Sequence, residues 1–317
     1  MTQPRPLVSI VTPSYDQAQF LEATIQSVIG QDYPHVEHIV IDGGSTDGSV
    51  EIVRKYADRL AYWVSEPDRG QSDAINKGLG RARGEVLAWL NSDDVYLPGC
   101  VSAAVAFLLD HPEVGMAYGD VEVIDVQGRT ILRPRWDEYD WVRQLTHRIT
   151  IPQPAAFFRR EVTDRVGRLR TDLHYAMDLE FWLRIGRRYP IRRIGQTLAQ
   201  FRLHPVSKSM KAADQWGAEF ITVLDDLFAD AALPTGLVRI KSRAYGGAYL
   251  HAAASALVVY DMPATRQRLR QAVRAYIPIV GRPQWWSVLA RSLLGRRGNQ
   301  IARSLKAWWS GSRYRLS

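Results

Sequence analysis

Two adjacent carboxylates, Asp93 and Asp94, follow a predicted apolar strand over residues 85–90. In an open α/β sheet, ligands bind beyond the carboxyl ends of the strands, so these carboxylates are expected to face a crevice. Their mutual repulsion would be relieved by a divalent cation such as Mg²⁺ or Mn²⁺, which prefers oxygen ligands and leaves positions for substrate phosphates. The same Ser-Asp-Asp run is also good capping material for a helix predicted over about 98–110.

A second set of candidate ligand residues follows two earlier predicted strands: Pro13, Ser14 and Tyr15 after the first, and Asp42 at the end of the second. Glycines at positions 43, 44 and 48 allow tight backbone there, and the next helix offers free N–H groups at its N-terminus. A carboxylate at such a strand end can accept hydrogen bonds from a nucleobase or a ribose. Residues 45–47 are equally good caps for that helix. Neither a GxGxxG nor a GxxxxGK[ST] loop occurs in the sequence.

The composition is that of a folded protein with one cysteine and an uneven charge. The chain has 317 residues, of which 46% are hydrophobic, enough for one large domain or two smaller ones. Cys100 is the only cysteine, so no intrachain disulfide can form. The apolar run at 7–11 is too short for a secretion signal, and residues 244–260 fall short of a membrane span. We therefore expect a cytoplasmic protein.

The elements predicted first alternate between strands and helices. Strands are expected over 7–12, 36–42, 60–65 and 85–90, with helices over 18–29, 46–56 and 71–81. Such alternation favours βαβ units and a largely parallel sheet flanked by helices. Further on, strands are expected over 114–118, 121–125, 155–159, 192–194 and 198–203, and a helix over 176–188.

After residue 208 the sequence has helical periodicity almost throughout. Helices are predicted over 212–228, 236–260, 263–276, 285–294 and 301–309. We expect one domain over residues 1–208 and a helical C-terminal region over 209–317.

The segments SIVTPSYDQAQFLEATIQSVIGQDYP, IVIDGGSTDGS and EPDRGQSDAINKGLGRARGEVLAWLNSDD lie between residues 8 and 94. Together they resemble a family 2 glycosyltransferase, the inverting, sugar-nucleotide-dependent type with the GT-A fold that is common in bacterial polysaccharide assembly. Four motifs occur in the family's order and spacing, and the resemblance covers about residues 7–205. It implies an α/β fold with a mixed, mainly parallel, Rossmann-like sheet and an enzyme that transfers a sugar to a glycan or lipid-linked acceptor.

The resemblance also implies a site for a nucleoside-diphosphate sugar, with UDP favoured and GDP or dTDP as alternatives. The implied nucleotide-side residues are Pro13, Ser14 and Tyr15 at the nucleobase, Asp42 at the base or ribose, and Gly70, Ala74 and Asn76 on a helix.

Asp93 and Asp94 correspond to the acidic motif that touches the ribose and holds Mn²⁺ or Mg²⁺ against the diphosphate. Asp94 is favoured as the direct metal ligand, with Asp93 as the alternative. Two residues depart from the pattern. Ile75 stands where many members have Arg, and Asn91 stands where many have a further Asp, which leaves one ligand fewer.

Inversion needs a base that removes the proton of the acceptor hydroxyl. The run YAMDLEFWLR at 175–184 resembles the family's ED-x-D-L-x-x-R box, with Met177 in place of Glu. It implies Asp178 as the base and Glu180 as a second acid. On a helix these two side chains lie about 200° apart, so at most one faces a cleft unless the helix begins between them. Glu180 and Arg184 also have the spacing of an i, i+4 ion pair.

The run FRLHPVSKS at 201–209 resembles the family's late R-x-H segment. His204 is expected to complete the metal shell or, with Arg202 and Lys208, to bind the departing diphosphate. Gln153, between two prolines, is a candidate for the acceptor side.

The C-terminal segment is strongly basic. After Asp261 the chain has twelve Arg and Lys and no acidic residue, so the total of +8 leaves −4 for residues 1–261. Trp285, Trp286, Trp308 and Trp309 are interleaved with these cations. Indoles with basic flanks are typical of a helix on an anionic bilayer, which predicts peripheral association with the inner face of the cell membrane. A helical cap over the sheet is the alternative.

Other classes of function explain less of the sequence. A nucleic-acid-binding protein would use the basic tail but leave the acidic motifs unexplained, so no nucleic acid is expected. A sugar-nucleotide-forming nucleotidyltransferase needs a Gly-rich, basic triphosphate loop after the first strand, which residues 15–18 do not supply. An inactive binding scaffold would not need the four acids Asp42, Asp93, Asp94 and Asp178.

Overall fold

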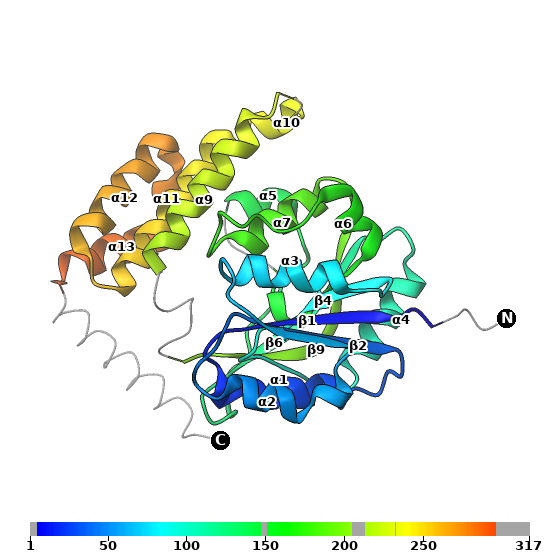
Figure 1. Ribbon diagram of the computed structural model, residues 1–317. Coiled ribbons are helices and arrows are strands. Elements are labelled where there is room, and N and C mark those ends of the chain that lie inside the picture. The colour runs from blue at the N-terminus through cyan, green and yellow to red at the C-terminus, as the bar shows by residue number, and fades with distance from the viewer. Residues whose placement is uncertain (1–4, 147–150, 205–212, 232, 296–317) are drawn as a thin grey trace, which may run out of the picture. The chain divides into compact units, whose positions relative to one another are not determined.

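The computed structural model describes residues 5–146, 151–204, 213–231 and 233–295 (Figure 1). The chain divides into two compact units. Unit 1 comprises Met1–Gln144 and Ile149–Ser207, and unit 2 comprises Leu145–Arg148 and Lys208–Ser317.

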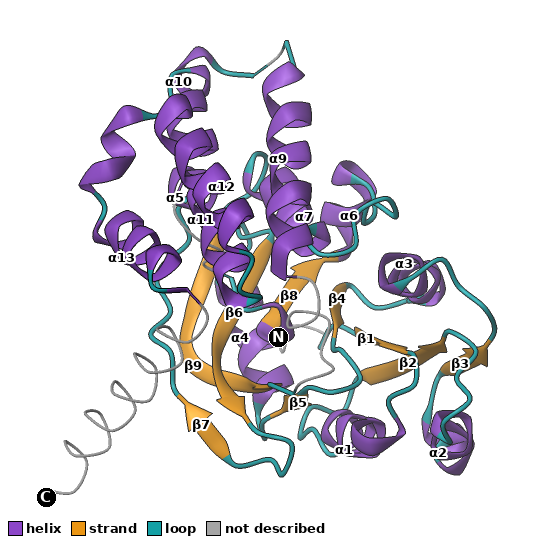
Figure 2. Cartoon of the chain, turned by 90° about the vertical axis from the view of Figure 1, so that its left-hand side faces the viewer, coloured by secondary structure: helices purple, strands orange, loops and turns teal. Residues whose placement is uncertain are grey.

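Unit 1 is built on a nine-stranded mixed sheet with the order β3-β2-β1-β4-β8-β6-β9-β5, and β7 pairs with β6 (Figure 2). The strands are β1 (Val8–Ser14), β2 (Val36–Asp42), β3 (Tyr62–Ser65), β4 (Val86–Trp89), β5 (Val95–Tyr96), β6 (Met116–Ile124), β7 (Thr130–Leu132), β8 (Ala156–Arg159) and β9 (Ile191–Arg202). The first four strands are mutually parallel, and β8 runs antiparallel between β4 and β6. The carboxyl ends of β2, β1 and β4 therefore lie at one edge.

Helices cover both faces of this sheet (Figures 1 and 2). The helices of unit 1 are α1 (Ala18–Ile29), α2 (Ser49–Lys55), α3 (Gln71–Arg81), α4 (Cys100–Asp110), α5 (Trp141–Thr146, which runs into unit 2), α6 (Arg160–Val166) and α7 (Met177–Gly186). Helices α1 and α4 share a core with β1, β4 and β6, which contains Val28, Val101 and Ala117. On the opposite face, Trp89 of β4 stacks on Trp182 of α7 with ring centroids 5.1 Å apart.

The bounds of the strands depend both on the local sequence pattern and on pairing between segments that are distant in sequence. The segments predicted over 114–118 and 121–125 form one strand, β6, and those over 192–194 and 198–203 form one strand, β9. Strand β6 continues through the polar residues Gly119 and Asp120. Its register with β9 shifts there, and the Asp120 carboxylate pairs with Arg193 at 2.6 Å. The short elements β5, β7, α5 and α6 were not predicted, since their strand pairing or packing partners are distant in sequence.

Unit 2 is helical, with α9 (Ala213–Ala229), α10 (Thr235–Val238), α11 (Lys241–Val258), α12 (Met262–Ala275) and α13 (Pro283–Leu293). The helix predicted over 236–260 is thus divided at residues 239–240. A core with Leu250, Leu257, Leu269 and Val288 holds α11, α12 and α13 together. Within the described ranges, no helix has both the length and the apolar character to cross a bilayer. The helix predicted over 301–309 lies outside the described residues.

Candidate active site

The carboxyl end of β4 is held by a chain of side-chain amides. Gln71, in the first turn of α3, donates from Nε2 to Oδ1 of Asn91 at 2.7 Å. Asn91 donates from Nδ2 to Oε1 of Gln153 at 2.9 Å and to Oδ2 of Asp94 at 3.3 Å. Gln153 in turn donates to the carbonyl oxygen of Trp89 at 2.7 Å. The residue that departs from the family pattern, Asn91, therefore links α3, β4 and the segment before β8.

Asp94 is fully buried and its side chain is engaged on both oxygens. Besides Asn91, the backbone N–H of Arg202 donates to its Oδ1 at 2.9 Å. Burial raises the pKa of the Asp94 carboxyl well above its usual range, and the neighbouring Asp93 carboxylate adds to that rise. Asp94 thus joins the end of β4 to β9, and its side chain is closed off from solvent.

Asp93 is partly open and lies against His204. Its Oδ2 is 3.0 Å from Nε2 of His204, and its side chain keeps 18% of its exposure. The His204 ring is buried against Phe20, with centroids 4.8 Å apart. Within the described part of the chain, Nδ1 of His204 has no hydrogen-bond partner. Asp93 and His204 are therefore a carboxylate and an imidazole that meet beyond the carboxyl ends of β4 and β9.

Arg202 contacts the backbone and the aromatic ring beside this pair. Its guanidinium donates from Nε to the carbonyl oxygen of Asp93 and from Nη1 to that of Asp125, both at 2.9 Å, and it lies over the ring of Phe20. Burial lowers the pKa of the guanidinium, an effect that Asp94 and Asp93 oppose. Because these donors are used by carbonyl groups, Arg202 orients the Asp93-Asp94 turn.

The residues predicted for the nucleotide side lie at the ends of β1 and β2. Asp42 is buried and accepts from the backbone N–H groups of Gly44 and Ser45 and from the hydroxyls of Ser45 and Ser65, at 2.6–3.1 Å. Ser14 pairs with Asp42 in the register of the two strands, and Pro13 is buried beside it. Tyr15 follows with 63% exposure. These contacts fix the loop after β2 and leave the Tyr15 ring as the accessible surface.

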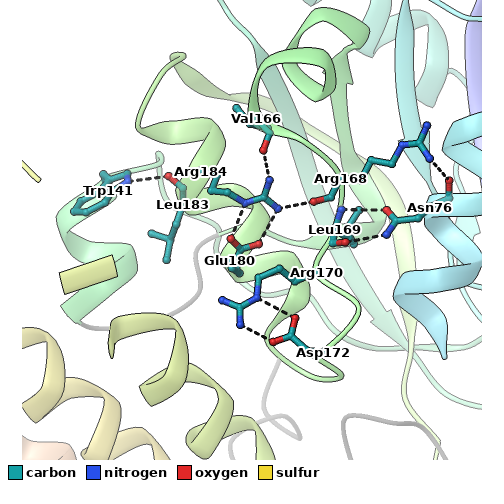
Figure 3. A network of polar contacts seen from close by, with 10 residues as sticks. All are labelled: Asn76, Trp141, Val166, Arg168, Leu169, Arg170, Asp172, Glu180, Leu183 and Arg184. Carbon is teal, nitrogen blue, oxygen red and sulfur yellow. Dashed lines mark hydrogen bonds and ion pairs between the residues drawn. The ribbon is translucent and has the colours of Figure 1, made fainter. Parts of the chain in front are cut away.

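The three residues predicted on helix α3 have structural contacts. Gly70 adopts φ +105° at its N-cap, a conformation that favours glycine. Ala74 is buried. Asn76 uses its side chain to hold the loop after α6, donating to the carbonyl oxygen of Leu169 at 2.8 Å and accepting from its N–H at 3.0 Å (Figure 3).

The segment with Asp178 meets α3 at its first turn. Ser72 of α3 donates to Sδ of Met177 at 2.8 Å, and Asp178 is the next residue, in the first turn of α7. Asp178 is half-buried, and its Oδ1 accepts from the N–H of Leu179 at 2.7 Å. Because Gln71 precedes Ser72, helix α3 connects Asp178 to the end of β4.

Glu180 points into a different set of contacts, drawn in Figure 3. Its two oxygens accept from Nε and Nη2 of Arg184 at 2.6 and 2.8 Å. Arg184 also donates to the carbonyl oxygens of Val166 and Arg168. Glu180 is buried, so this ion pair ties α7 to the loop after α6. Lys208 lies outside the described residues.

The donor set fits a divalent cation only in part. Among the described residues, no three His, Cys, Asp or Glu side chains come together as a metal cluster. Asp93 and His204 do lie together, and a site for Mn²⁺ or Mg²⁺ can be made from one or two protein ligands plus substrate phosphates. The residues therefore fit a cation that is held jointly with a bound diphosphate.

The sequence did not assign roles to Gln71 and Phe20, and it treated Asn91 only as a lost ligand. The sequence signal for Asn91 and Gln153 was an amide side chain just after the strand that becomes β4 and another just before the strand that becomes β8. Nothing in the sequence indicated the contact between Phe20 and His204, because a Phe at position 20 is already explained by the apolar face of α1.

Comparisons with known proteins agree with this architecture. The family model described as Glycosyl transferase family 2 matches residues 9–167. The uncharacterized glycosyltransferase MT1564 of Mycobacterium tuberculosis is 34% identical over 186 residues, which cover 56% of this chain and 68% of that protein.

Two solved structures share the fold. TarS 1-349 of S. aureus, in complex with UDP-GlcNAc, has a TM-score of 0.60 at 16% identity and covers 86% of this chain and 90% of its own. The mannosyltransferase PcManGT of Pyrobaculum calidifontis, in complex with GDP-Man and Mn²⁺, has a TM-score of 0.59 at 23% identity. The match covers 92% of this chain and 86% of that one. The predicted GT-A fold, with its mixed sheet and C-terminal helices, is confirmed.

Proposed function

The chain belongs to glycosyl transferase family 2, and from this premise we propose an inverting transfer of a sugar from a nucleoside diphosphate to a hydroxyl of a glycan or lipid-linked acceptor. The observation that carries the proposal is the shared edge of the sheet at which Asp42 ends β2, Asp93 follows β4 and His204 follows β9, with Asp178 connected to it through α3. Ligands of open α/β sheets bind at such an edge.

The nucleotide occupies the side formed by β1 and β2. Tyr15 offers an exposed ring for stacking on the base, and the N–H groups and hydroxyls around Asp42 set the shape of the loop there. UDP is the favoured carrier, and GDP or dTDP are the alternatives. Structural neighbours bound to UDP-GlcNAc and to GDP-Man support a nucleotide-sugar donor without selecting one.

Asp93 and His204 are the residues that would hold Mn²⁺ or Mg²⁺ together with the diphosphate. Asp94, which the sequence favoured, is buried and doubly hydrogen-bonded, so we assign it to support of the turn. A bound cation supplies positive charge that offsets the charge growing on the leaving diphosphate. The Mn²⁺ in the PcManGT complex supports a metal of this kind.

Asp178 acts as the general base. Its carboxylate accepts the proton of the acceptor hydroxyl while that oxygen bonds to the anomeric carbon and the bond from this carbon to the diphosphate oxygen breaks on the opposite face. It lies half-buried in the first turn of α7, the helix that Ser72 of α3 contacts at Met177. Glu180 is committed to Arg184, so it supports α7 rather than serving as a second base.

Separate variants test the base and the metal site. Asp178→Asn should abolish sugar transfer but keep the rise in melting temperature that UDP and Mn²⁺ cause together, because it removes only the proton acceptor. Asp93→Asn should lose most of the Mn²⁺-dependent part of that rise, since a ligand that binds the folded state stabilises it by mass action.

Asp172→Asn is the matched control, because Asp172 is an exposed carboxylate just before the same helix, paired with Arg170. It should leave both transfer and the melting-temperature rise unchanged. Substantial turnover by Asp178→Asn, or loss of its nucleotide binding, would contradict the role of Asp178. Unchanged Mn²⁺ dependence in Asp93→Asn would contradict the metal assignment.

A further inference from the structure

Helix α13 has an apolar surface that is wider than the face packed in the core of unit 2. Its inner face carries the buried Val288 and Ser292, with Trp285 and Leu289 packed against the core that α13 shares with α11 and α12 (Figure 1). A helix that packs on one side normally presents polar residues on the other. On α13, apolar residues also continue onto an exposed arc beside the packed face, and we call this arc the outer face.

The outer face consists of Trp286, Ala290, Leu293 and Leu294, which lie within about 100° of arc on the helix. Trp286 is 58% exposed, Leu293 68% and Leu294 54%. The Trp286 indole donates to the carbonyl oxygen of Val280 at 2.8 Å, so its ring lies against the turn η3 (Ile277–Gly281). That turn adds Ile277, which is 73% exposed. Four large apolar side chains thus remain exposed on adjoining elements.

The surrounding sequence carries only positive charge. From Met262 to the C-terminus there are twelve Arg and Lys and no Asp or Glu. Arg270 and Arg274 are exposed on α12, the helix that packs beside α13. An occupant of the apolar face must therefore be both apolar and anionic.

We propose that the outer face of α13, with Ile277, docks this protein on an anionic lipid bilayer. Apolar side chains including an indole, flanked by cations, are the chemistry of a helix that lies in the headgroup region, and each basic residue near an anionic surface strengthens binding. Residues 262–275 and 283–293 form amphipathic helices that pack in unit 2, so the contact is peripheral. A second copy of this chain is disfavoured as the occupant, because it would bring the same positive segment against itself.

This inference is independent of the proposed chemistry, since it uses no residue of the active site. It extends the prediction made from the tail sequence to particular side chains within the described residues. Docking through unit 2 would also place the enzyme at a surface that contains lipid-linked acceptors.

Co-sedimentation of the full chain with lipid vesicles tests the proposal. Wild-type protein should bind vesicles of phosphatidylcholine and phosphatidylglycerol at low salt, bind pure phosphatidylcholine weakly, and dissociate as salt screens the charges. The double variant Trp286→Ser/Leu293→Ser should bind the anionic vesicles about tenfold more weakly or worse, because it removes most of the inserted apolar area. Arg270→Gln/Arg274→Gln should lower the preference for anionic over neutral vesicles.

Ile131→Ser/Leu132→Ser is the matched control, since these side chains of β7 in unit 1 are 54% and 58% exposed. It should bind vesicles like the wild type. A melting-temperature rise with UDP and Mn²⁺ in every variant shows that unit 1 is folded, and near-wild-type helical circular dichroism shows the same for unit 2.

Three results would overturn the proposal: no binding of the wild type to anionic vesicles, equal binding by the Trp286/Leu293 variant, or an equal loss in the β7 control. If ultracentrifugation shows a dimer that only the Trp286/Leu293 variant dissociates, while vesicle binding is unchanged, a second copy covers this face instead.

Discussion

Asp93 and Asp94 are neighbours in sequence but have different environments. Asp94 is buried and accepts hydrogen bonds from Asn91 and the N–H of Arg202, and its burial raises the pKa of its carboxyl. Asp93 keeps an open side and meets His204. The difference comes from β9, since the N–H of Arg202 donates to Asp94 and His204, just after that strand, lies beside Asp93. These environments favour Asp94 as a residue that supports the site and Asp93 as one that can bind a ligand.

At the residue scale, the Glu180-Arg184 pair gives a stability prediction. Arg184→Gln leaves the buried Glu180 carboxylate and two backbone carbonyls without their donor, so we expect a loss of about 2 kcal/mol in the free energy of unfolding. Urea unfolding measures it.

The control is Arg54→Gln, which breaks an i, i+3 pair with Glu51 in which both side chains are at least 63% exposed. We expect less than about 0.5 kcal/mol there. Similar losses for the two variants would contradict a supporting role for the Glu180-Arg184 pair.

At the scale of elements, α3 is the part that brings the two halves of the site together. Its first turn contacts Asn91 through Gln71 and Met177 through Ser72, and its later turns lie on β1. Gly78 makes that close approach possible, because a Cβ there would collide with the side chain of Val11. The position of α3 on the sheet therefore depends on a residue that touches no ligand.

Gly78→Ala should destabilise the protein by about 1–3 kcal/mol, since Val11 is fully buried and cannot move without disturbing β1. Because α3 would shift, the affinity for UDP with Mn²⁺ should fall as well. Thermal unfolding and nucleotide titration measure the two effects.

Gly80→Ala, in the same helix, serves as the comparison. A Cβ at Gly80 would lie 3.3 Å from Nη1 of Arg168, the flexible end of a long side chain. Replacing a helical glycine by alanine there should stabilise the protein by up to about 1 kcal/mol. The assigned role of Gly78 fails if both variants change stability in the same direction by similar amounts.

At the scale of the whole molecule, the two units have separate cores and opposite charge tendencies. The sheet of unit 1 packs its own apolar layers, and unit 2 has the cluster around Leu250 and Leu269. Unit 1 has 23 Arg and Lys against 27 Asp and Glu, a net charge of −4, whereas unit 2 has 18 against 6, a net charge of +12. We propose sugar chemistry for unit 1 and surface attachment for unit 2.

Hydrogen exchange followed by mass spectrometry should show this division. Adding UDP and Mn²⁺ should slow amide exchange in peptides at 13–15, 42–48 and 91–94, because ligand contact suppresses local opening there. Adding anionic vesicles should instead slow exchange in peptides over 277–294. Protection by the nucleotide that appears only in unit 2 would refute the placement of the donor site.

The sequence alone determined the elements whose signals are local. Residues 18–29, 36–42 and 71–81 form a helix, a strand and a helix with the predicted bounds, because apolar spacing and flanking glycines act over a few residues. The family motifs also determined the fold and the class of enzyme, since their order along the chain is itself sequence information.

Only the tertiary structure decided what depends on distant partners. It joined two predicted strands into β6 because β9 pairs along its whole length, and it assigned Glu180 to Arg184 and Asn76 to Leu169. It separated Asp93 from Asp94 because burial and the N–H of Arg202 act on one carboxylate and not the other. Burial and hydrogen bonding are properties of residues brought together by folding, so local sequence patterns do not contain them.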